Sequence, residues 1–85
     1  MAATKQDISE WFNRGVQDKA DYMIVVCDTY DWDDYPVYAN KSDVHAKYQE
    51  HNGPNMQKVM EVYDLHSDKD EQMNERRANR LPALT

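Results

Sequence analysis

The stretch Tyr22–Cys27 constrains the fold more than any other part of the chain, because every one of its residues is apolar. Successive side chains of a β-strand point to opposite faces, so this stretch would present apolar side chains on both faces of a sheet. Such a strand needs cover on both sides. The sequence therefore predicts a strand over residues 21–28 that lies at the centre of a sheet.

The size of the chain predicts one domain. With 85 residues, we expect a single unit over residues 1–80 and a flexible C-terminal tail over residues 81–85. The single cysteine, Cys27, cannot form an intrachain disulfide, and the N-terminus lacks the apolar segment of a secretory signal. Both features favour a reducing compartment and predict a cytoplasmic location.

A first helix is predicted over about residues 5–18. Thr4 followed by Asp7 resembles a capping box, in which each residue's side chain bonds to the backbone of the other. The apolar residues that follow recur at helical spacing and form one stripe: Ile8, Trp11, Phe12 and Val16. Because Trp11 and Phe12 lie on this stripe, we interpret both as core residues.

The middle of the chain predicts a second strand and a second helix. A short strand is expected over Pro36–Ala39, and Pro36 should lie at a strand start or on an edge, because proline has no N–H to donate. Ser42 is a suitable N-cap for a helix with Val44 and Tyr48 facing inward. The sequence Asn52–Asn55, which contains Gly and Pro, should end that helix.

The last third of the chain is less clearly patterned. In Met56–Leu65 the apolar residues fit both strand alternation and helical spacing, and we favour a strand because turn signals bound this short segment on both sides. Ser67 could cap a third helix from Asp68 to about Asn79, with acidic residues in its first turn and arginines in its last.

These elements predict a small α/β (α+β) domain of two layers, with the order α-β-β-α-β-α. Its three-stranded mixed sheet has the order 2-1-3, with the helices packed on it and with strands 2 and 3 running parallel. In that sheet the second helix ends near the end of the first strand. His51, Asn52 and Asn55 should therefore lie at the same rim as the residues that follow Cys27.

Several segments resemble a family of short bacterial and phage proteins that has no assigned function. The resemblance is carried by Met23–Thr29 (MIVVCDT), Asp34–Tyr38 (DYPVY) and Met56–Leu65 (MQKVMEVYDL), and Glu75–Ala78 (ERRA) also fits. Together these segments span most of the chain. The resemblance implies a self-contained small domain from a bacterium or its virus, and it supplies no catalytic residue.

The charge pattern limits the classes of partner. The net charge is −6, and four aspartates lie within seven residues: Asp28, Asp31, Asp33 and Asp34. A chain with this balance is repelled by phosphate groups, so we expect neither direct nucleic-acid binding nor docking on an anionic membrane. No apolar run approaches the ~20 residues of a membrane helix. The pattern favours a protein partner with a basic surface, or a cation.

No set of residues predicts a cofactor or an active site. Carboxylates suit Ca²⁺ or Mg²⁺, but the acidic stretch has neither the spacing nor the glycine of an EF-hand loop. The candidates for a metal site are therefore weak: Asp28, Asp31, Asp33 and His51. The possible zinc ligands are scattered, with no paired spacing: Cys27, His45, His51 and His66. We expect no cofactor, no bound metal and no enzymatic activity.

The acidic stretch also carries aromatic residues, which predicts an interaction surface. Tyrosine and tryptophan dominate binding hot spots, and flanking carboxylates would steer a basic partner. We expect the partner-binding residues to form an exposed rim: Tyr30, Asp31, Trp32, Asp33, Asp34 and Tyr35. The expected function is a small acidic, non-catalytic protein-interaction module, with a phage-derived modulator of a host protein as the form that the resemblance suggests. The alternative is a small-ligand or divalent-cation binder that uses the acidic rim around Asp28–Asp34.

Self-association is a further expectation. Three helices, one of them weakly apolar, can hardly cover both faces of the sheet. The side chains of Met23, Val25 and Cys27 would then need another surface, and a two-fold homodimer is the commonest solution.

Overall fold

A computed structural model describes residues 4–53, 56–75 and 79–81. It contains the six elements in the predicted order: α1 (Lys5–Gln17), β1 (Tyr22–Asp28), β2 (Asp33–Ala39), α2 (Val44–His51), β3 (Gln57–Asp64) and α3 (Lys69–Met73). The small α+β domain expected from the sequence is therefore confirmed.

The three strands form one sheet of the order β2-β1-β3, as predicted. β2 and β3 run in the same direction, which was also expected. They are not neighbours, however, because β1 lies between them and pairs antiparallel with each. Every hydrogen-bonded pair of strands is thus antiparallel, and the expectation of a mixed sheet is wrong in that respect.

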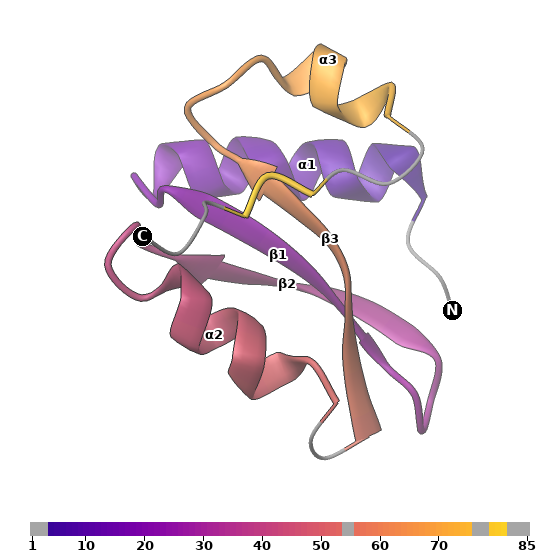
Figure 1. Ribbon diagram of the computed structural model, residues 1–85. Coiled ribbons are helices and arrows are strands. Elements are labelled where there is room, and N and C mark those ends of the chain that lie inside the picture. Colours follow the sequence, from indigo (N-terminus) through magenta and orange to yellow (C-terminus); the bar gives the residue numbers. More distant parts are fainter. Residues whose placement is uncertain (1–3, 54–55, 76–78, 82–85) are drawn as a thin grey trace.

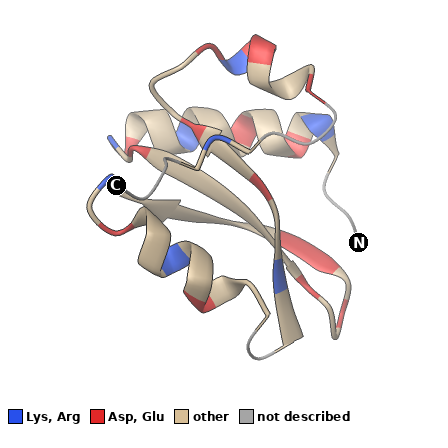
Figure 2. Ribbon diagram, in the orientation of Figure 1, with Lys and Arg blue, Asp and Glu red and all other residues tan. Residues whose placement is uncertain are grey.

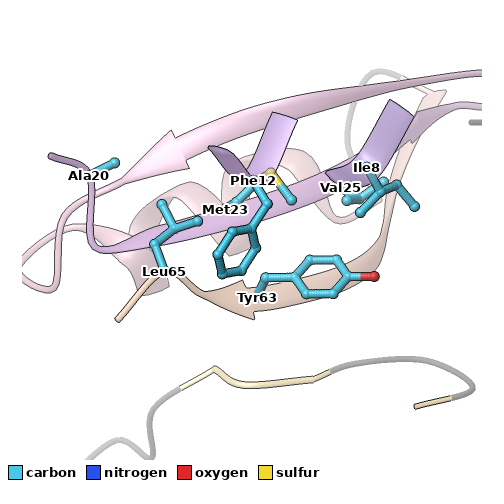
Figure 3. Close-up of a cluster of buried hydrophobic side chains, with 7 residues drawn as sticks. All are labelled: Ile8, Phe12, Ala20, Met23, Val25, Tyr63 and Leu65. Atoms are coloured by element: carbon cyan, nitrogen blue, oxygen red, sulfur yellow. The ribbon is translucent and has the colours of Figure 1, made fainter. Parts of the chain in front are cut away.

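Helices cover both faces of the sheet, so the domain has three layers where two were expected. α1 and α3 lie on one face and α2 on the other (Figure 1). The α1 face holds one buried cluster, shown in Figure 3: Ile8, Phe12, Ala20, Met23, Val25, Tyr63 and Leu65. The α2 face holds a second: Tyr22, Ile24, Val26, Ala39, Val44 and Val62. The two-faced apolar strand requires this arrangement, since each face needs its own cover.

The cover on the α1 face bears on self-association. Met23, Val25 and Cys27 are 0%, 1% and 5% exposed within a single chain. Phe12 of α1 packs in one cluster with Met23 and Val25, and its ring meets the Tyr63 ring edge to face at a centroid distance of 6.3 Å. These side chains need no second copy for cover, so the argument that led us to expect a dimer no longer applies.

α1 begins as predicted, but the last residue on its buried face is not the one that was predicted. The Asp7 N–H donates to Thr4 Oγ1 and the Thr4 N–H donates to Asp7 Oδ2, both at 3.1 Å, which completes the capping box. Val16, expected on the inner face, is 48% exposed. Gly15 is buried instead, because the helix approaches the sheet closely there: a Cβ atom on Gly15 would lie 2.8 Å from Leu65 and from Tyr38.

β2 is longer than predicted and α2 starts one residue later. β2 begins at Asp33, and its pairing with β1 runs to the Asp28–Asp33 pair. Pro36 lies in an edge strand, as expected. The N-cap of α2 is Asp43, where Ser42 was predicted. α2 ends at the predicted place, since Asn52 is the C-cap and Gly53 follows with a φ of +114°, a conformation that suits glycine. The rest of the predicted stop signal, residues 54–55, lies outside the described residues.

The ambiguous segment is a strand, as favoured, and a β-bulge explains the ambiguity. Val25 pairs with Glu61 while Val26 pairs with Val59, which leaves Met60 as an extra residue in β3. The bulge shifts the alternation by one position. Val59 and Val62 therefore share the α2 face, and Met60 and Tyr63 share the α1 face, both at a spacing of three residues.

α3 is short and differs from its prediction at both ends. It spans Lys69–Met73, and its N-cap is Asp68 instead of Ser67. Asn79, predicted at the end of the helix, forms a parallel bridge with Val62 on the outer edge of β3. Leu81, assigned to the flexible tail, packs against the α2-face cluster. Residues 76 and 77, two of the arginines expected in the last turn of this helix, lie outside the described residues, as do the tail residues 82–85.

Two polar residues tie the start of β1 and the end of β3 to their neighbours. Gln72 of α3 is 1% exposed, and its amide accepts from the Asp64 N–H at 2.7 Å and donates to the Asp64 carbonyl at 2.9 Å. Asp21 precedes β1, and its carboxylate accepts from the Lys41 N–H at 2.8 Å and pairs with His66 Nε2 at 2.7 Å. We call this region, made of Asp21, Lys41, Asp64–His66 and Gln72, the Asp21 end.

Candidate functional site

The opposite end of β1 carries the acidic stretch. We call this region the hairpin end: residues 28–35, which join β1 to β2, together with His51 and residues 56–58 at the start of β3. The carbonyl of Asp28 accepts from the Trp32 N–H at 2.6 Å, and its carboxylate accepts from the Tyr30 N–H at 2.9 Å. Trp32 has a φ of +59°, a left-handed conformation that closes the hairpin. The loop proper is therefore Thr29–Trp32.

The hairpin loop is fastened to the start of β3. The Thr29 N–H and the Thr29 hydroxyl both donate to the carbonyl of Met56, at 2.7 and 2.8 Å. This double contact joins two segments that lie 27 residues apart in the sequence. It brings the side chains of the loop and of the first residues of β3 into one surface.

Exposed apolar side chains gather on this surface. Tyr30, Trp32 and Met56 are 72%, 61% and 55% exposed. Among the described residues, the other large hydrophobic side chain with high exposure is Val16, in the last turn of α1 and at the opposite end of the molecule. Two aromatic rings and a thioether, all exposed at one end of the sheet, are the kind of side chains that binding hot spots contain.

The predicted rim divides into two parts. Tyr30, Asp31 and Trp32 are exposed in the loop, as expected. The other three, Asp33, Asp34 and Tyr35, belong to β2, because the hairpin pairs almost to its tip. Asp33 is exposed and faces Asp28 across the two strands, whereas Asp34 is half-buried.

Tyr35 is a packing residue on the α2 face. Its hydroxyl donates to Gln57 Oε1 at 2.5 Å, and its ring meets the His51 ring edge to face at a centroid distance of 6.3 Å. His51 Nδ1 lies 2.7 Å from the same Gln57 oxygen. Burial raises the pKa of Tyr35, and the charge of Asp28 adds to the rise. The expected proximity of the end of α2 to the acidic stretch is thus found for His51, while Asn55 lies outside the described residues.

Charge is concentrated at the hairpin end. In Figure 2 the acidic colour follows the β1–β2 hairpin and the start of β2, and a basic segment lies in the first part of β3. That basic residue is Lys58, whose ammonium nitrogen lies 5.8 Å from the centroid of the Trp32 ring. Four aspartates and one lysine therefore share this surface with the exposed aromatic rings.

The weak metal candidates do not form a ligand set. Within residues 4–53, 56–75 and 79–81, no group of three or more His, Cys, Asp or Glu side chains is placed to hold a metal ion. His51 is engaged with Gln57 and Tyr35 on the α2 face. Asp28 uses its carboxylate to hold the loop backbone.

Cys27 has the surroundings of a structural residue. It is 5% exposed, and burial raises the pKa of its thiol, as does a hydrogen bond with Asp34. A thiol held in its protonated form is a poor nucleophile. The environment therefore matches the small buried hydrophobe that the sequence suggested.

Comparisons with known proteins add no relative: no protein-family model, no curated protein and no solved structure matches the chain. The described part of the chain contains no helix that is long and apolar enough to cross a membrane.

Sequence reasoning missed two residues of the hairpin end, Met56 and Lys58. Lys58 is the second residue of β3 and Met56 directly precedes the strand, and the sheet order 2-1-3 places this segment beside the end of β1. That order was predicted, so the signal was available. From that order we expected the polar residues at the end of α2 and in the following turn at this rim, and we did not consider the residues that come after the turn.

Proposed function

We propose that the protein is a small acidic, non-catalytic interaction module of the cytoplasm, and that its hairpin end binds a protein partner with a basic surface. One observation carries the proposal: Tyr30, Trp32 and Met56 are exposed together beside four aspartates. Exposed aromatic side chains supply contact area, and the carboxylates steer an oppositely charged surface during encounter.

The test compares capture by matched variants. The wild-type protein, a Tyr30→Ala/Trp32→Ala variant and a Val16→Ala variant are immobilised, and the proteins retained from a bacterial lysate are identified. Val16 is the control, because it is also apolar and exposed but lies far from the hairpin end. We expect a basic protein that wild type and Val16→Ala retain and the double variant loses. The proposal is wrong if all three retain the same proteins equally.

Kinetics with the purified partner then test the role of charge. Asp31→Asn/Asp33→Asn/Asp34→Asn should fold and should associate more slowly, with a weaker dependence on salt. Glu10→Gln/Asp18→Asn/Asp70→Asn removes the same charge from exposed positions elsewhere and is the matched control. Equal effects of the two triple variants would mean that net charge, and not the hairpin end, steers the partner.

The alternative, a cation binder, has a separate test. A ligand that binds only the folded protein stabilises it by RT ln(1 + [L]/Kd). Thermal melts in EDTA and in excess Ca²⁺ or Zn²⁺ should therefore agree within about two degrees if no specific site exists. A large stabilisation by one of the ions would favour the alternative instead.

A further inference from the structure

A cation of this chain already lies over an exposed aromatic ring of the hairpin end. The Lys58 ammonium lies 5.8 Å from the Trp32 centroid, within the ~6 Å at which a cation is attracted to the face of an indole. The Trp32 side chain is nevertheless 61% exposed, so the lysine leaves much of it open to solvent.

The strand register explains why Lys58 reaches the ring. Lys58 pairs with Cys27, and Cys27 pairs with Asp34 on its other side, so the three residues form one row across the sheet. Trp32 precedes β2 directly and has a left-handed backbone. Lys58 is itself exposed, and its long side chain is held by this contact at an accessible site. It can leave the ring at small cost, because cation–π pairs at exposed sites are weak.

We propose that Trp32 is the receptor for an arginine side chain of the protein partner, and that Lys58 is a tethered competitor which the arginine displaces. The proposal rests on the proposed function and names the group that the hairpin end recognises. The Trp32 ring, which Asp31 and Asp33 flank in the sequence, already has a cation of this chain, Lys58, over it.

Arginine fits this surface better than a second lysine. Its guanidinium is planar and weakly hydrated, stacks on aromatic faces and presents a fork of N–H donors that matches a carboxylate. A partner's lysine would offer the same group as Lys58, which has the advantage of being tethered beside the ring. The charge of the hairpin end also favours a cationic ligand, because the stretch Asp28–Asp34 contains four aspartates and no lysine or arginine.

The test uses hexaarginine and hexalysine as probes of equal charge on the full-length protein, with affinities measured by calorimetry at fixed salt. Hexaarginine should bind more tightly than hexalysine. Lys58→Gln should tighten hexaarginine binding about two- to fivefold, which is the factor that corresponds to a weak exposed cation–π contact. Lys41→Gln removes the same charge at a distance from the ring and should change the affinity less.

A double-mutant cycle separates the ring from the charge. In the Trp32→Leu background, Lys58→Gln should give only the small gain seen with Lys41→Gln, because no ring is left to release. In the wild type, NMR should show the Lys58 side-chain protons shifted by the indole ring. Hexaarginine and Trp32→Leu should each abolish that shift.

Two outcomes would overturn the inference. Equal binding of both peptides, with the same effect of Lys58→Gln in both backgrounds, would show that Trp32 recognises no arginine, while a basic partner could still bind through charge. Tighter binding of a trimethyllysine peptide than of hexaarginine would assign the ring to quaternary ammonium groups. If neither peptide binds and the Tyr30→Ala/Trp32→Ala variant retains the same proteins as wild type, the proposed function itself fails.

Discussion

The two ends of β1 differ in the surroundings of their aspartate carboxylates. At the Asp21 end, one aspartate accepts from the Lys41 N–H and pairs with His66, and its backbone carbonyl accepts from the Leu65 N–H at 3.0 Å. At the hairpin end, Asp31 is exposed between two exposed aromatic residues. The first end joins segments of the chain to one another. The second leaves charged and apolar groups to solvent, where a partner can reach them.

Along one strand, the contacts that hold the fold lie at one end, and the exposed side chains that we propose bind a partner lie at the other. The polar contacts of the Asp21 end and the cluster under α1 hold the fold, whereas the exposed side chains of the hairpin end contribute little to it. A surface that contributes little to the fold can change its residues without unfolding the protein. Three predictions test this separation.

The largest contrast is expected between two aromatic residues. Phe12→Ala should lower the free energy of unfolding by about 3–5 kcal/mol, because the ring is 4% exposed and fills the α1-face cluster. Trp32→Ala removes a larger side chain but should cost less than about 1 kcal/mol, since the ring is mostly exposed. Urea denaturation followed by circular dichroism measures both. A loss above about 2 kcal/mol for Trp32→Ala would mean that the hairpin end is part of the structural core.

A smaller contrast is expected between two glutamines. Gln72→Leu should cost about 1–3 kcal/mol, because the Gln72 amide is buried and makes hydrogen bonds to both the N–H and the carbonyl of Asp64 that leucine cannot replace. Gln57→Leu at the hairpin end should cost about 1 kcal/mol or less, since the groups that it serves, on Tyr35 and His51, are only half-buried. Exposed Gln49→Leu is the control for the change in residue type. Urea denaturation measures the loss of unfolding free energy for each variant. Equal losses for Gln72→Leu and Gln57→Leu would contradict the proposed difference between the two ends.

The smallest effect is expected in the dependence of stability on pH. Hydrogen bonds from His66 and from the Lys41 N–H lower the pKa of Asp21 below its ordinary value of 3.8. Because the folded-state pKa is the lower one, the stabilisation is complete above pH 3.8 and is lost as the pH falls through the folded-state pKa. Wild type should therefore exceed Asp21→Asn in stability at pH 6.

That difference in stability should shrink on acidification. Urea midpoints measured for wild type and Asp21→Asn from pH 6 to about pH 2.5 would show the convergence. Asp31→Asn removes the same charge from the hairpin end and is the matched control. A gap between wild type and Asp21→Asn that stays constant over this interval would show that the ionised form of Asp21 does not provide the stabilisation.

Much of the fold was predictable because it depends on local and repeating patterns. The apolar run of β1 fixed the centre of the sheet, and the Thr4–Asp7 capping box fixed the start of α1. Gly53 marked the end of α2, because its positive φ is a conformation that glycine adopts more easily than other residues do. Each of these signals lies within a few residues of the feature that it predicts.

The predictions from sequence were wrong where contacts between residues distant in the sequence determine the structure. Gly15 is buried because Tyr38 and Leu65 approach it from the sheet, and nothing near Gly15 in the sequence indicates this. Gln72 is buried because its amide meets the exposed edge of β3. The bulge at Met60 gave a strand the three-residue spacing that helices show, so the pattern alone could not separate the two.

The candidate site was predictable in composition but not in shape. The loop residues Tyr30–Trp32 were correctly expected to be exposed. The inward turn of Tyr35 depends on the extension of β2 to Asp33, which requires the pairing with β1 to continue through two facing aspartates. Propensity disfavours aspartate in strands, and here the hairpin pairing overrides it.

Both outer strands of the sheet carry an interruption, and this has a consequence for aggregation. Pro36 lies in the middle of edge strand β2, and edge strand β3 has the bulge at Met60 and the bridge from Asn79 to Val62. Strands of other molecules add most readily to flat, continuous edges, as in the growth of amyloid fibrils. The segment best suited to such growth is β1, which both neighbours cover. Fibril formation should therefore start from unfolded molecules, at a rate set by their population, and the native protein should remain dispersed at high concentration.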